Sequence, residues 1–137
     1  CGVGLFALPM AKQFANVIGV EENSEAIRFA KQNKARAAAA NVEFKRMRVR
    51  DFLKGHELSK TDFVLIDPPR AGAEDHTIEL IAKMAPKQIS YVSCEPSILA
   101  RDLRILIDRG YQIDAMTAID LFPQTHHVET VVTLRKI

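Results

Sequence analysis

The sequence predicts an α/β fold with a mainly parallel sheet and an antiparallel pair of strands at its C-terminal end. Short β-branched runs alternate with longer helical patterns along the 137 residues, as in strands joined by helical crossovers. The last two strand-like runs have no helical pattern between them, so we expect them to pair antiparallel. A chain of this length buries one hydrophobic core but not two, so residues 1–137 are expected to form one domain.

The composition excludes several classes of protein. Hydrophobic residues make up 47% and charged residues 26%, and 19 Lys+Arg against 17 Asp+Glu give a net charge of +2. These values are typical of a globular domain and not of a disordered or collagen-like chain. No run approaches the roughly 18 apolar residues of a spanning helix, so no membrane partner is expected.

The two cysteines, Cys1 and Cys94, cannot form the disulfide framework of a small secreted domain. Their spacing to other ligand-type residues suggests no zinc site, so no bound metal is expected. A reducing, cytoplasmic setting follows as the expectation.

The first half of the chain carries the pattern strand, helix, strand. Asn16 to Glu21 is a strand-like run that ends on an acidic residue. Asn23 or Ser24 can cap a helix that extends to about Ala39, and Val42 to Met47 is the next predicted strand. The predicted buried face of this helix contains Ala26, Phe29, Ala30, Asn33 and Ala37.

The second half continues the alternation. Four successive apolar residues predict a fully buried strand at Phe63 to Asp67. Gly110 is expected to stop a helix whose buried side includes Ile98, Ile105 and Leu106, with Arg101 and Asp102 as exceptions. The remaining predicted elements are a helix at Thr77–Met84, a strand at Gln88–Ser93, the helix at Ser97–Arg109, and strands at about Gln112–Ile119 and Val128–Leu134.

In such sheets, ligands bind beyond the carboxyl ends of the strands. The residues from Gly2 to Ala7 fit the dinucleotide pattern GxGxxA, and Glu21 follows Gly2 by 21 − 2 = 19 residues, close to the spacing of a ribose-binding acid. Gly2 and Gly4 would let the backbone approach a nucleotide. The pattern fits NAD and S-adenosylmethionine alike, and a tight turn without a ligand is the alternative.

Two further segments follow predicted strands directly. Asp67 is followed by two prolines, which remove backbone donors and stiffen the chain, so the carboxylate is held at the ligand edge. Methyltransferases that act on bases often have such a segment, although an Asp67 that caps a helix or forms a salt bridge is the alternative. Cys94 lies in a strand-to-helix turn, where nearby donors favour thiolate, although a free cysteine is often a small buried hydrophobic residue.

Glu129 lies at the start of the last strand, where it is either directed to the ligand side or solvated. It follows two adjacent histidines, His126 and His127. Neighbouring residues of an extended chain point to opposite faces, so these two side chains are not expected to share a metal.

Together these segments resemble the RNA (uracil-5-)-methyltransferases. The resemblance rests on residues 1–4 (Cys-Gly-Val-Gly), 67–70 (Asp-Pro-Pro-Arg), 93–96 (Ser-Cys-Glu-Pro) and 122–129 (Phe-Pro-Gln-Thr-His-His-Val-Glu), in this order. It covers the whole chain and corresponds to the C-terminal catalytic domain of these enzymes. It implies a Rossmann-like class I methyltransferase fold, S-adenosylmethionine as cofactor, and C5 methylation of a uridine in rRNA or tRNA.

The resemblance also implies a covalent mechanism, because C5 of uracil is too poor a nucleophile to take a methyl group directly. Cys94 would attack C6, and C5 of the resulting enolate would take the methyl group. Glu129 would remove the C5 proton as general base. Gly2, Gly4 and Glu21 would bind the cofactor, and Asp67 would lie at the cofactor or at the target base. The uridine must leave its stack to reach the thiol.

Other classes stay open at this point. Cytosine-5 RNA methyltransferases carry a second cysteine after the preceding strand, where this chain has Asp67 to Arg70. Amino-group methyltransferases with an Asp-Pro-Pro loop need an aromatic residue where Arg70 stands. A non-catalytic Rossmann-like module or an NAD enzyme would use the glycine turn without the thiol.

Residues 1–4 have the pattern of a turn that follows a strand, but no strand-like run precedes them. We therefore expect residues 1–137 to be a methyltransferase catalytic domain truncated at its N-terminus, and inactive or nearly so by themselves. In many members of the family an iron–sulfur cluster is bound by N-terminal cysteines, and any such cluster would belong to residues ahead of Cys1. RNA is the expected partner, and no obligate protein partner is predicted.

Overall fold

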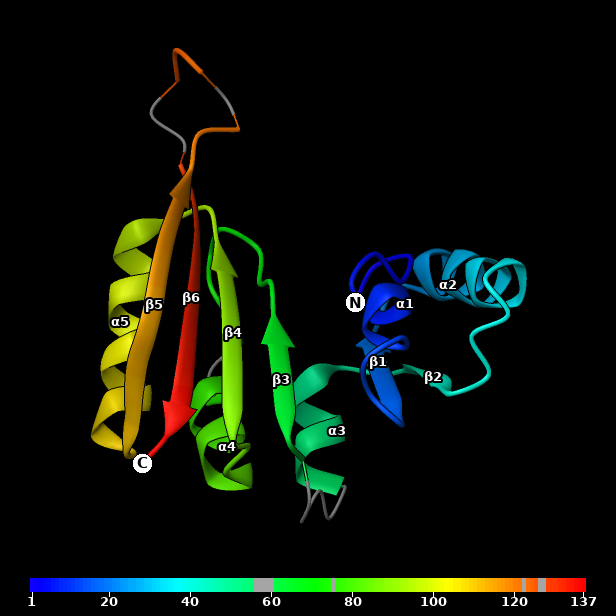
Figure 1. Cartoon of the computed structure of the whole chain (residues 1–137), viewed down its shortest axis with the longest axis horizontal. Helices are drawn as coiled ribbons and strands as arrows, with labels where there is room; N and C mark the ends of the chain where they lie inside the picture. The colour runs from blue at the N-terminus through cyan, green and yellow to red at the C-terminus, as the bar shows by residue number, and fades with distance from the viewer. Residues whose placement is uncertain (56–60, 75, 122, 126–127) are drawn as a thin grey trace. The chain divides into compact units, whose positions relative to one another are not determined.

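A computed structural model describes residues 1–55, 61–74, 76–121, 123–125 and 128–137 (Figure 1). These residues belong to two compact units, Cys1–Gly55 (unit 1) and His56–Ile137 (unit 2), and each unit is described by itself. The assignment of all 137 residues to one catalytic domain stays a prediction.

Unit 1 is built on two parallel strands and three helices. Its elements are α1 (Ala7–Met10), β1 (Val17–Glu21), α2 (Ser24–Arg36), β2 (Val42–Arg46) and α3 (Val49–Gly55). The ladder runs from Val17 opposite Val42 to Glu21 opposite Arg46, so Glu21 is the last residue of β1. The core of this unit contains Ala7, Val17, Ile27, Ala30, Val42 and Phe44.

Helix α2 begins where the sequence predicts and ends at Arg36, three residues before the expected end. The Asn23 side chain accepts hydrogen bonds from the backbone N–H groups of Glu25 and Ala26 at 2.9 and 3.0 Å, which satisfies two donors at the helix start. The predicted buried face is confirmed at Ala30, which is 0% exposed, and wrong at Phe29 and Ala37. Ile27 is buried, whereas Phe29 is 43% exposed because the ring lies on the solvent side of the helix, 4.8 Å below the Arg28 guanidinium.

Unit 2 contains a four-stranded sheet in the order β3-β4-β6-β5. Strands β3 and β4 are parallel, and β6 is antiparallel to both of its neighbours. The predicted antiparallel pairing of the last two strands is confirmed, with β6 inside the sheet. The elements are β3 (Phe63–Ile66), α4 (Thr77–Met84), β4 (Gln88–Ser93), α5 (Pro96–Asp108), β5 (Tyr111–Ile119) and β6 (Glu129–Lys136).

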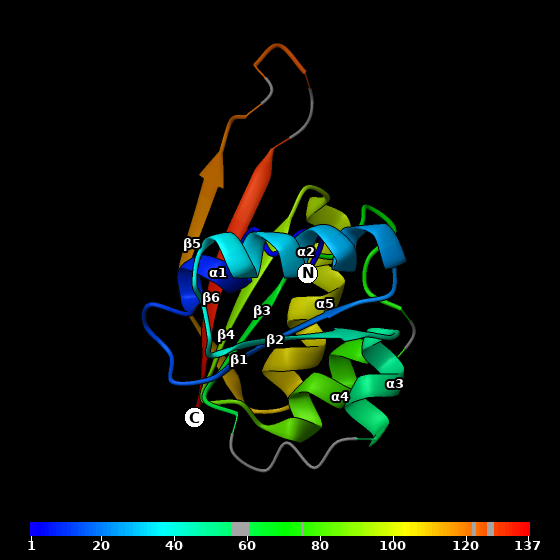
Figure 2. The same ribbon diagram turned by 90° about the vertical axis from the view of Figure 1, so that its right-hand side faces the viewer.

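The two helices of unit 2 contact each other and lie on the same side of this sheet, as Figure 2 shows. The strand residues on that side are buried, and they include Tyr91 and Ser93 of β4 and Val132 and Leu134 of β6. Their neighbours along each strand point to the opposite face and are half-buried. Alternation along β4 and β6 therefore gives the sheet a helix-covered face and a second, less buried face.

The expectation of a fully buried strand at Phe63 to Asp67 was wrong, because the strand ends at Ile66 and Asp67 is exposed. All four residues of β3 are half-buried. The physical reason is that β3 is the outer strand of the four-stranded sheet and, among the described strands, pairs with β4 alone. An apolar run of this length gives no information on whether its strand is central or at an edge.

The C-terminal end of unit 2 carries a predicted stop and an unpredicted bulge. Gly110 has a φ of +83° and its N–H donates to the Ile107 carbonyl at 2.9 Å, which ends α5 as expected. The register of β5 against β6 shifts between Ile113 and Ala115, so Asp114 is an extra residue in β5. Its Oδ1 accepts a hydrogen bond from Arg135 Nε at 2.7 Å.

Gly19 in β1 gives a test of the packing of unit 1. A Cβ at this position would lie 2.7 Å from Cδ1 of the Phe44 ring, so Gly19→Ala must displace a buried side chain. We expect Gly19→Ala to lower the free energy of unfolding by about 1–3 kcal/mol, measured by urea titration. The control is Gly55→Ala at the end of α3, where a Cβ meets nothing within 4 Å. Equal effects of the two substitutions would contradict this account.

Candidate functional site

The glycine turn of unit 1 has the geometry that its sequence predicts. Gly2 and Gly4 have φ values of +54° and +90°, in the region that favours glycine. A Cβ on Gly4 would lie 3.0 Å from Cζ of Phe44, so side chains are also excluded there by packing. The Gly4 carbonyl accepts from the Leu8 N–H at 3.1 Å, and the turn thereby leads into α1.

Glu21, at the end of β1, holds this turn in place. Its Oε2 accepts hydrogen bonds from the Gly2 N–H at 2.9 Å and from the Cys1 nitrogen at 3.1 Å. Its Oε1 accepts from the Asn23 N–H at 3.0 Å. The structure therefore brings together Gly2 and Glu21, which the sequence pattern links across 19 residues.

The same hydrogen bonds keep the Glu21 carboxylate charged. Burial alone would raise its pKa, but the hydrogen bonds from the Asn23 and Gly2 N–H groups and from the Cys1 nitrogen outweigh it and lower the pKa from 4.5 to about 2. A carboxylate can accept about four hydrogen bonds. The three described donors leave a place for one more, such as a hydroxyl group.

Asn33 is a residue of this turn that the sequence did not identify. Its side-chain Nδ2 donates to the Val3 carbonyl at 3.1 Å, which fixes the outer part of the glycine turn to α2. The available signal was a polar residue on the predicted apolar face of that helix.

In unit 2, the carboxyl ends of β3 and β4 and the start of β6 lie at one end of the four-stranded sheet (Figure 1). Asp67 directly follows β3, and Cys94 directly follows the parallel strand β4. Glu129 is the first residue of β6, which starts at this end because it runs antiparallel to β4. The carboxyl ends of two parallel strands and the start of an antiparallel strand thus meet at one edge.

The register of β4 against β6 relates Cys94 to Glu129. Ser93 opposite Thr130 is the last pair of this ladder; Cys94 follows that pair on β4, and Glu129 precedes it on β6. Cys94 is a free cysteine, and both residues are half-buried. A thiol and a carboxylate therefore both adjoin the last pair of the ladder.

Ser93 and Glu95 define the turn that contains Cys94. The buried Ser93 hydroxyl accepts from the Glu95 N–H and donates to the Glu95 carbonyl, both at 3.1 Å. Glu95 Oε1 in turn accepts from the Ser97 N–H at 3.4 Å and from the Ser97 hydroxyl at 2.8 Å at the start of α5. The backbone on both sides of the cysteine is therefore fixed by side-chain hydrogen bonds, whereas the sequence motif at residues 93–96 assigned a role to neither Ser93 nor Glu95.

Asp67 belongs to the segment stiffened by Pro68 and Pro69. The residue is exposed, yet the protein around its carboxyl group removes enough water to raise the pKa. No described side chain hydrogen-bonds to this carboxyl group, whereas the Glu21 carboxylate accepts several hydrogen bonds. Asp67 thus differs electrostatically from Glu21, whose pKa is lowered.

Some expectations concern residues that the structure does not describe. Phe122, His126 and His127 lie outside the described residues. Among the residues that are described, no group of three or more His, Cys, Asp or Glu side chains could hold a metal ion. In that same part of the chain, every helix is too short or too polar to cross a membrane.

The pKa of Glu21 predicts a pH dependence of stability. A carboxyl group whose pKa falls on folding stabilises the folded state above its unfolded pKa of 4.5, and this contribution disappears as the pH falls toward 2. We expect Glu21→Gln to cost on the order of 1–3 kcal/mol near neutral pH, measured by urea unfolding. The difference between the two proteins should shrink as the pH is lowered from 4.5 toward 2.

Glu22→Gln is the matched control. Glu22 is largely exposed and pairs with Arg48 at 3.4 Å on the surface, so its loss should change stability by no more than about 1 kcal/mol. A pH profile that is the same for both variants would refute the role assigned to Glu21.

The family of this chain follows from its similarity to known proteins. All 137 residues match the family described as tRNA (Uracil-5-)-methyltransferase. The 23S rRNA (uracil(1939)-C(5))-methyltransferase RlmD of Shewanella sediminis is 46% identical over 132 residues, which cover 96% of this chain. An RNA methyltransferase of Thermotoga maritima, whose activity is not characterised, is 42% identical over 135 residues, or 98% of this chain. The chain spans 30% of the length of each relative.

Solved structures give the same result. The Pyrococcus abyssi tRNA (uracil-54, C5)-methyltransferase, in complex with S-adenosyl-L-homocysteine, matches 97% of this chain and 32% of its own, with a TM-score of 0.77 and 35% identity. NSun6 from Pyrococcus horikoshii matches 99% of this chain and 46% of its own, with a TM-score of 0.78 at 16% identity, which supports the fold alone. Because the family match extends over every residue, this chain belongs to the tRNA (Uracil-5-)-methyltransferase family.

Proposed function

We propose that these residues form the catalytic domain of an RNA methyltransferase that transfers a methyl group from S-adenosylmethionine to C5 of a uridine in rRNA or tRNA. The observation that carries this proposal is that Cys94 and Glu129 both adjoin Ser93 and Thr130, the last pair of the β4–β6 ladder. Family membership and the RNA substrates named for the relatives support it. RNA in the cytoplasm is the proposed substrate.

The glycine turn fits the proposed cofactor. A Cβ on Gly2 would meet no atom within 4 Å, so there is open space beside its backbone. Glu21 keeps a charged carboxylate with capacity for one more donor, which suits a ribose hydroxyl. We assign Gly2, Gly4 and Glu21 to cofactor binding. When bound, the cofactor supplies an electrophilic methyl group on a sulfonium.

The thiol and the carboxylate then divide the covalent chemistry. The Cys94 thiolate forms a bond to C6 of the uracil, and the electron pair moves to C5 and O4 as an enolate. C5 takes the methyl group, and Glu129 accepts the C5 proton. The electrons of the C5–H bond restore the C5–C6 double bond as the C6–S bond breaks, which releases Cys94.

Asp67 completes the proposed site. Its place at the end of β3, next to the end of β4, puts its carboxyl group at the same sheet edge as Cys94. The raised pKa makes this carboxyl easier to protonate than an ordinary aspartate. We assign it to hydrogen bonding with the cofactor or with the target base.

Cys94→Ser tests the nucleophile. The complete gene product that carries these residues is incubated with 5-fluorouridine RNA and cofactor, and the covalent protein–RNA adduct is measured by gel electrophoresis. Fluorine at C5 cannot leave as a proton would, so the adduct should accumulate in the wild type. Cys94→Ser should form no adduct and should lose at least about a thousandfold in methylation rate. Cys1→Ser, which removes the other thiol of residues 1–137, should still form it, and an adduct in Cys94→Ser would sink the assignment.

Glu129→Gln tests the base. The amide cannot accept the C5 proton, so turnover with ordinary uridine RNA should fall by about a hundredfold to ten-thousandfold, while attack by Cys94 remains possible. A covalent intermediate with unmodified RNA should therefore accumulate in this variant and is measured by denaturing electrophoresis. Glu43→Gln, an exposed carboxylate in β2, is the control and should turn over normally. Normal turnover in Glu129→Gln would rule out the base role.

A further inference from the structure

The position of the Cys94 thiol depends on how β4 and α5 are placed against each other. Cys94 and Glu95 are the whole connection between β4, which ends at Ser93, and α5, which begins at Pro96. A connection this short leaves little freedom, so the position of the thiol follows from how the helix is set against the strand. The contacts between β4 and α5 are therefore relevant to the reaction.

A buried hydrogen bond joins these two elements. The Tyr91 hydroxyl of β4 donates to Oδ2 of Asp102 in α5 at 2.6 Å, and the two residues are 0% and 1% exposed. Burial, together with the Asp102 carboxylate, raises the pKa of Tyr91, so the phenol keeps its proton and remains a donor. The bond lies three residues before Cys94 on the strand (94 − 91) and eight residues after it on the helix (102 − 94).

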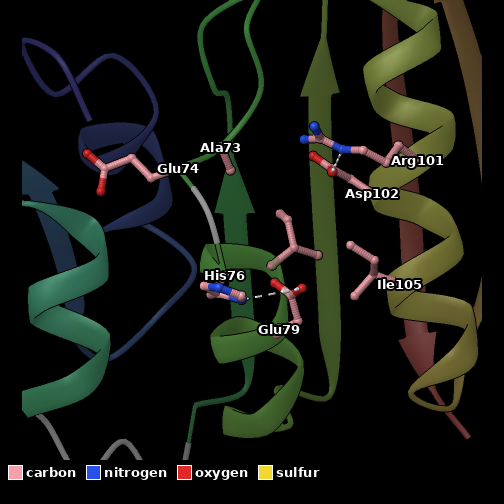
Figure 3. A pocket seen from close by; sticks show the side chains of 8 residues that line it. Ala73, Glu74, His76, Glu79, Arg101, Asp102 and Ile105 are labelled. Carbon is pink, nitrogen blue, oxygen red and sulfur yellow. Dashed lines mark hydrogen bonds and ion pairs between the residues drawn. The ribbon is translucent and has the colours of Figure 1, made fainter.

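Arg101 extends this contact toward the Asp67 segment. Its Nε donates to Asp102 Oδ1 at 2.9 Å, as the dashed line in Figure 3 shows. A Cβ on Gly72 would lie 2.8 Å from Nη2 of Arg101 and 2.7 Å from the Ile98 side chain. The chain that follows Asp67 thus passes directly against α5. One buried carboxylate is linked to both segments that carry proposed site residues.

The two bonds to Asp102 differ in strength. The Arg101 side chain is 54% exposed and, with Asp102, lines a cavity of about 210 Å³ that opens between α4 and α5 (Figure 3). Solvent screening weakens an ion pair of this kind. The Tyr91 bond has both partners inside the protein and is the stronger constraint on the distance between strand and helix.

Stability alone does not account for this arrangement. A buried charged group loses its hydration, and apolar side chains of similar volume often stabilise a core as well or better. A hydrogen bond adds direction, because it fixes the rotation and the height of α5 against β4 within narrow limits. We propose, on the basis of the function proposed above, that Tyr91 and Asp102 are positioning residues that hold Cys94 in its reactive place.

Tyr91→Phe removes the donor and keeps the ring. Tyr111→Phe is the matched control. The Tyr111 hydroxyl is also buried and donates to the Pro86 carbonyl at 2.8 Å. Tyr111 and Pro86 lie at the end of the sheet opposite to Cys94. Each variant of the complete gene product is compared with the wild type in two assays. One measures the rate of adduct formation with 5-fluorouridine RNA in a single turnover, and the other measures the rate of Cys94 alkylation by iodoacetamide, followed by mass spectrometry of the peptide that contains Cys94.

We expect both variants to shift the urea unfolding midpoint by similar amounts, since each loses one buried hydrogen bond. Only Tyr91→Phe should slow adduct formation, by on the order of tenfold to a hundredfold, as misplacement of a reacting group does. Only Tyr91→Phe should change the alkylation rate of Cys94. Equal effects of the two variants on both rates would overturn the proposal.

Different results would contradict the proposed function and the positioning role of Tyr91. If the wild type forms no adduct, the proposed function fails, and the alkylation comparison still decides whether Tyr91 positions the thiol. If Tyr91→Phe does not fold, Asp102→Asn replaces it. The side-chain oxygen of the introduced asparagine would still accept from Tyr91, but the negative charge of the aspartate is lost. We therefore expect a smaller change in the same direction. Unchanged adduct and alkylation rates in this variant would again overturn the proposal.

Discussion

The antiparallel pairing of β6 with β4 is the constraint on which the chemistry of unit 2 depends. β6 enters the sheet between β4 and β5, and the ladder that forms there decides which residues meet just beyond its last pair. A slip of one residue would move Val132 and Leu134, now 0% exposed, to the less buried face. The burial of these two side chains therefore also keeps Cys94 and Glu129 next to the last pair of the ladder. The same strand register therefore determines both the packing of the core and the placement of the proposed reacting groups in this sheet.

Most of the fold could be predicted because its strands are short apolar runs between turn residues. The α/β class, the parallel pairs and the final antiparallel pair are all confirmed. The sequence did not reveal α1 and α3, because four and seven residues are too few to display a helical period, and α3 buries little besides Phe52. The buried face of α2 and the edge position of β3 depend on tertiary neighbours, which periodicity does not report.

The candidate site was predictable in part for a similar reason. Asp67 and Cys94 follow strand ends, and the rule that ligands bind at the carboxyl ends of parallel strands applies to them directly. That Cys94 and Glu129 lie beside the same strand pair depends on the register of β6, which no local pattern contains. From the sequence, Asp102 is only a charged exception on the predicted buried face of its helix. Its partner Tyr91 is on another element, and only the folded structure reveals that this aspartate is among the most buried residues of unit 2.

The bulge in β5 bears on how the protein behaves in solution. β5 is the outer strand of its sheet and exposes Met116 and Ile119, and such an edge can recruit a strand from another molecule. The extra residue, Asp114, breaks the regular spacing of backbone donors and acceptors and adds a charge, held by Arg135, to the strand. A second molecule would have to match an irregular ladder and desolvate this ion pair. The bulge therefore opposes edge-to-edge aggregation at the place where the strand is most apolar.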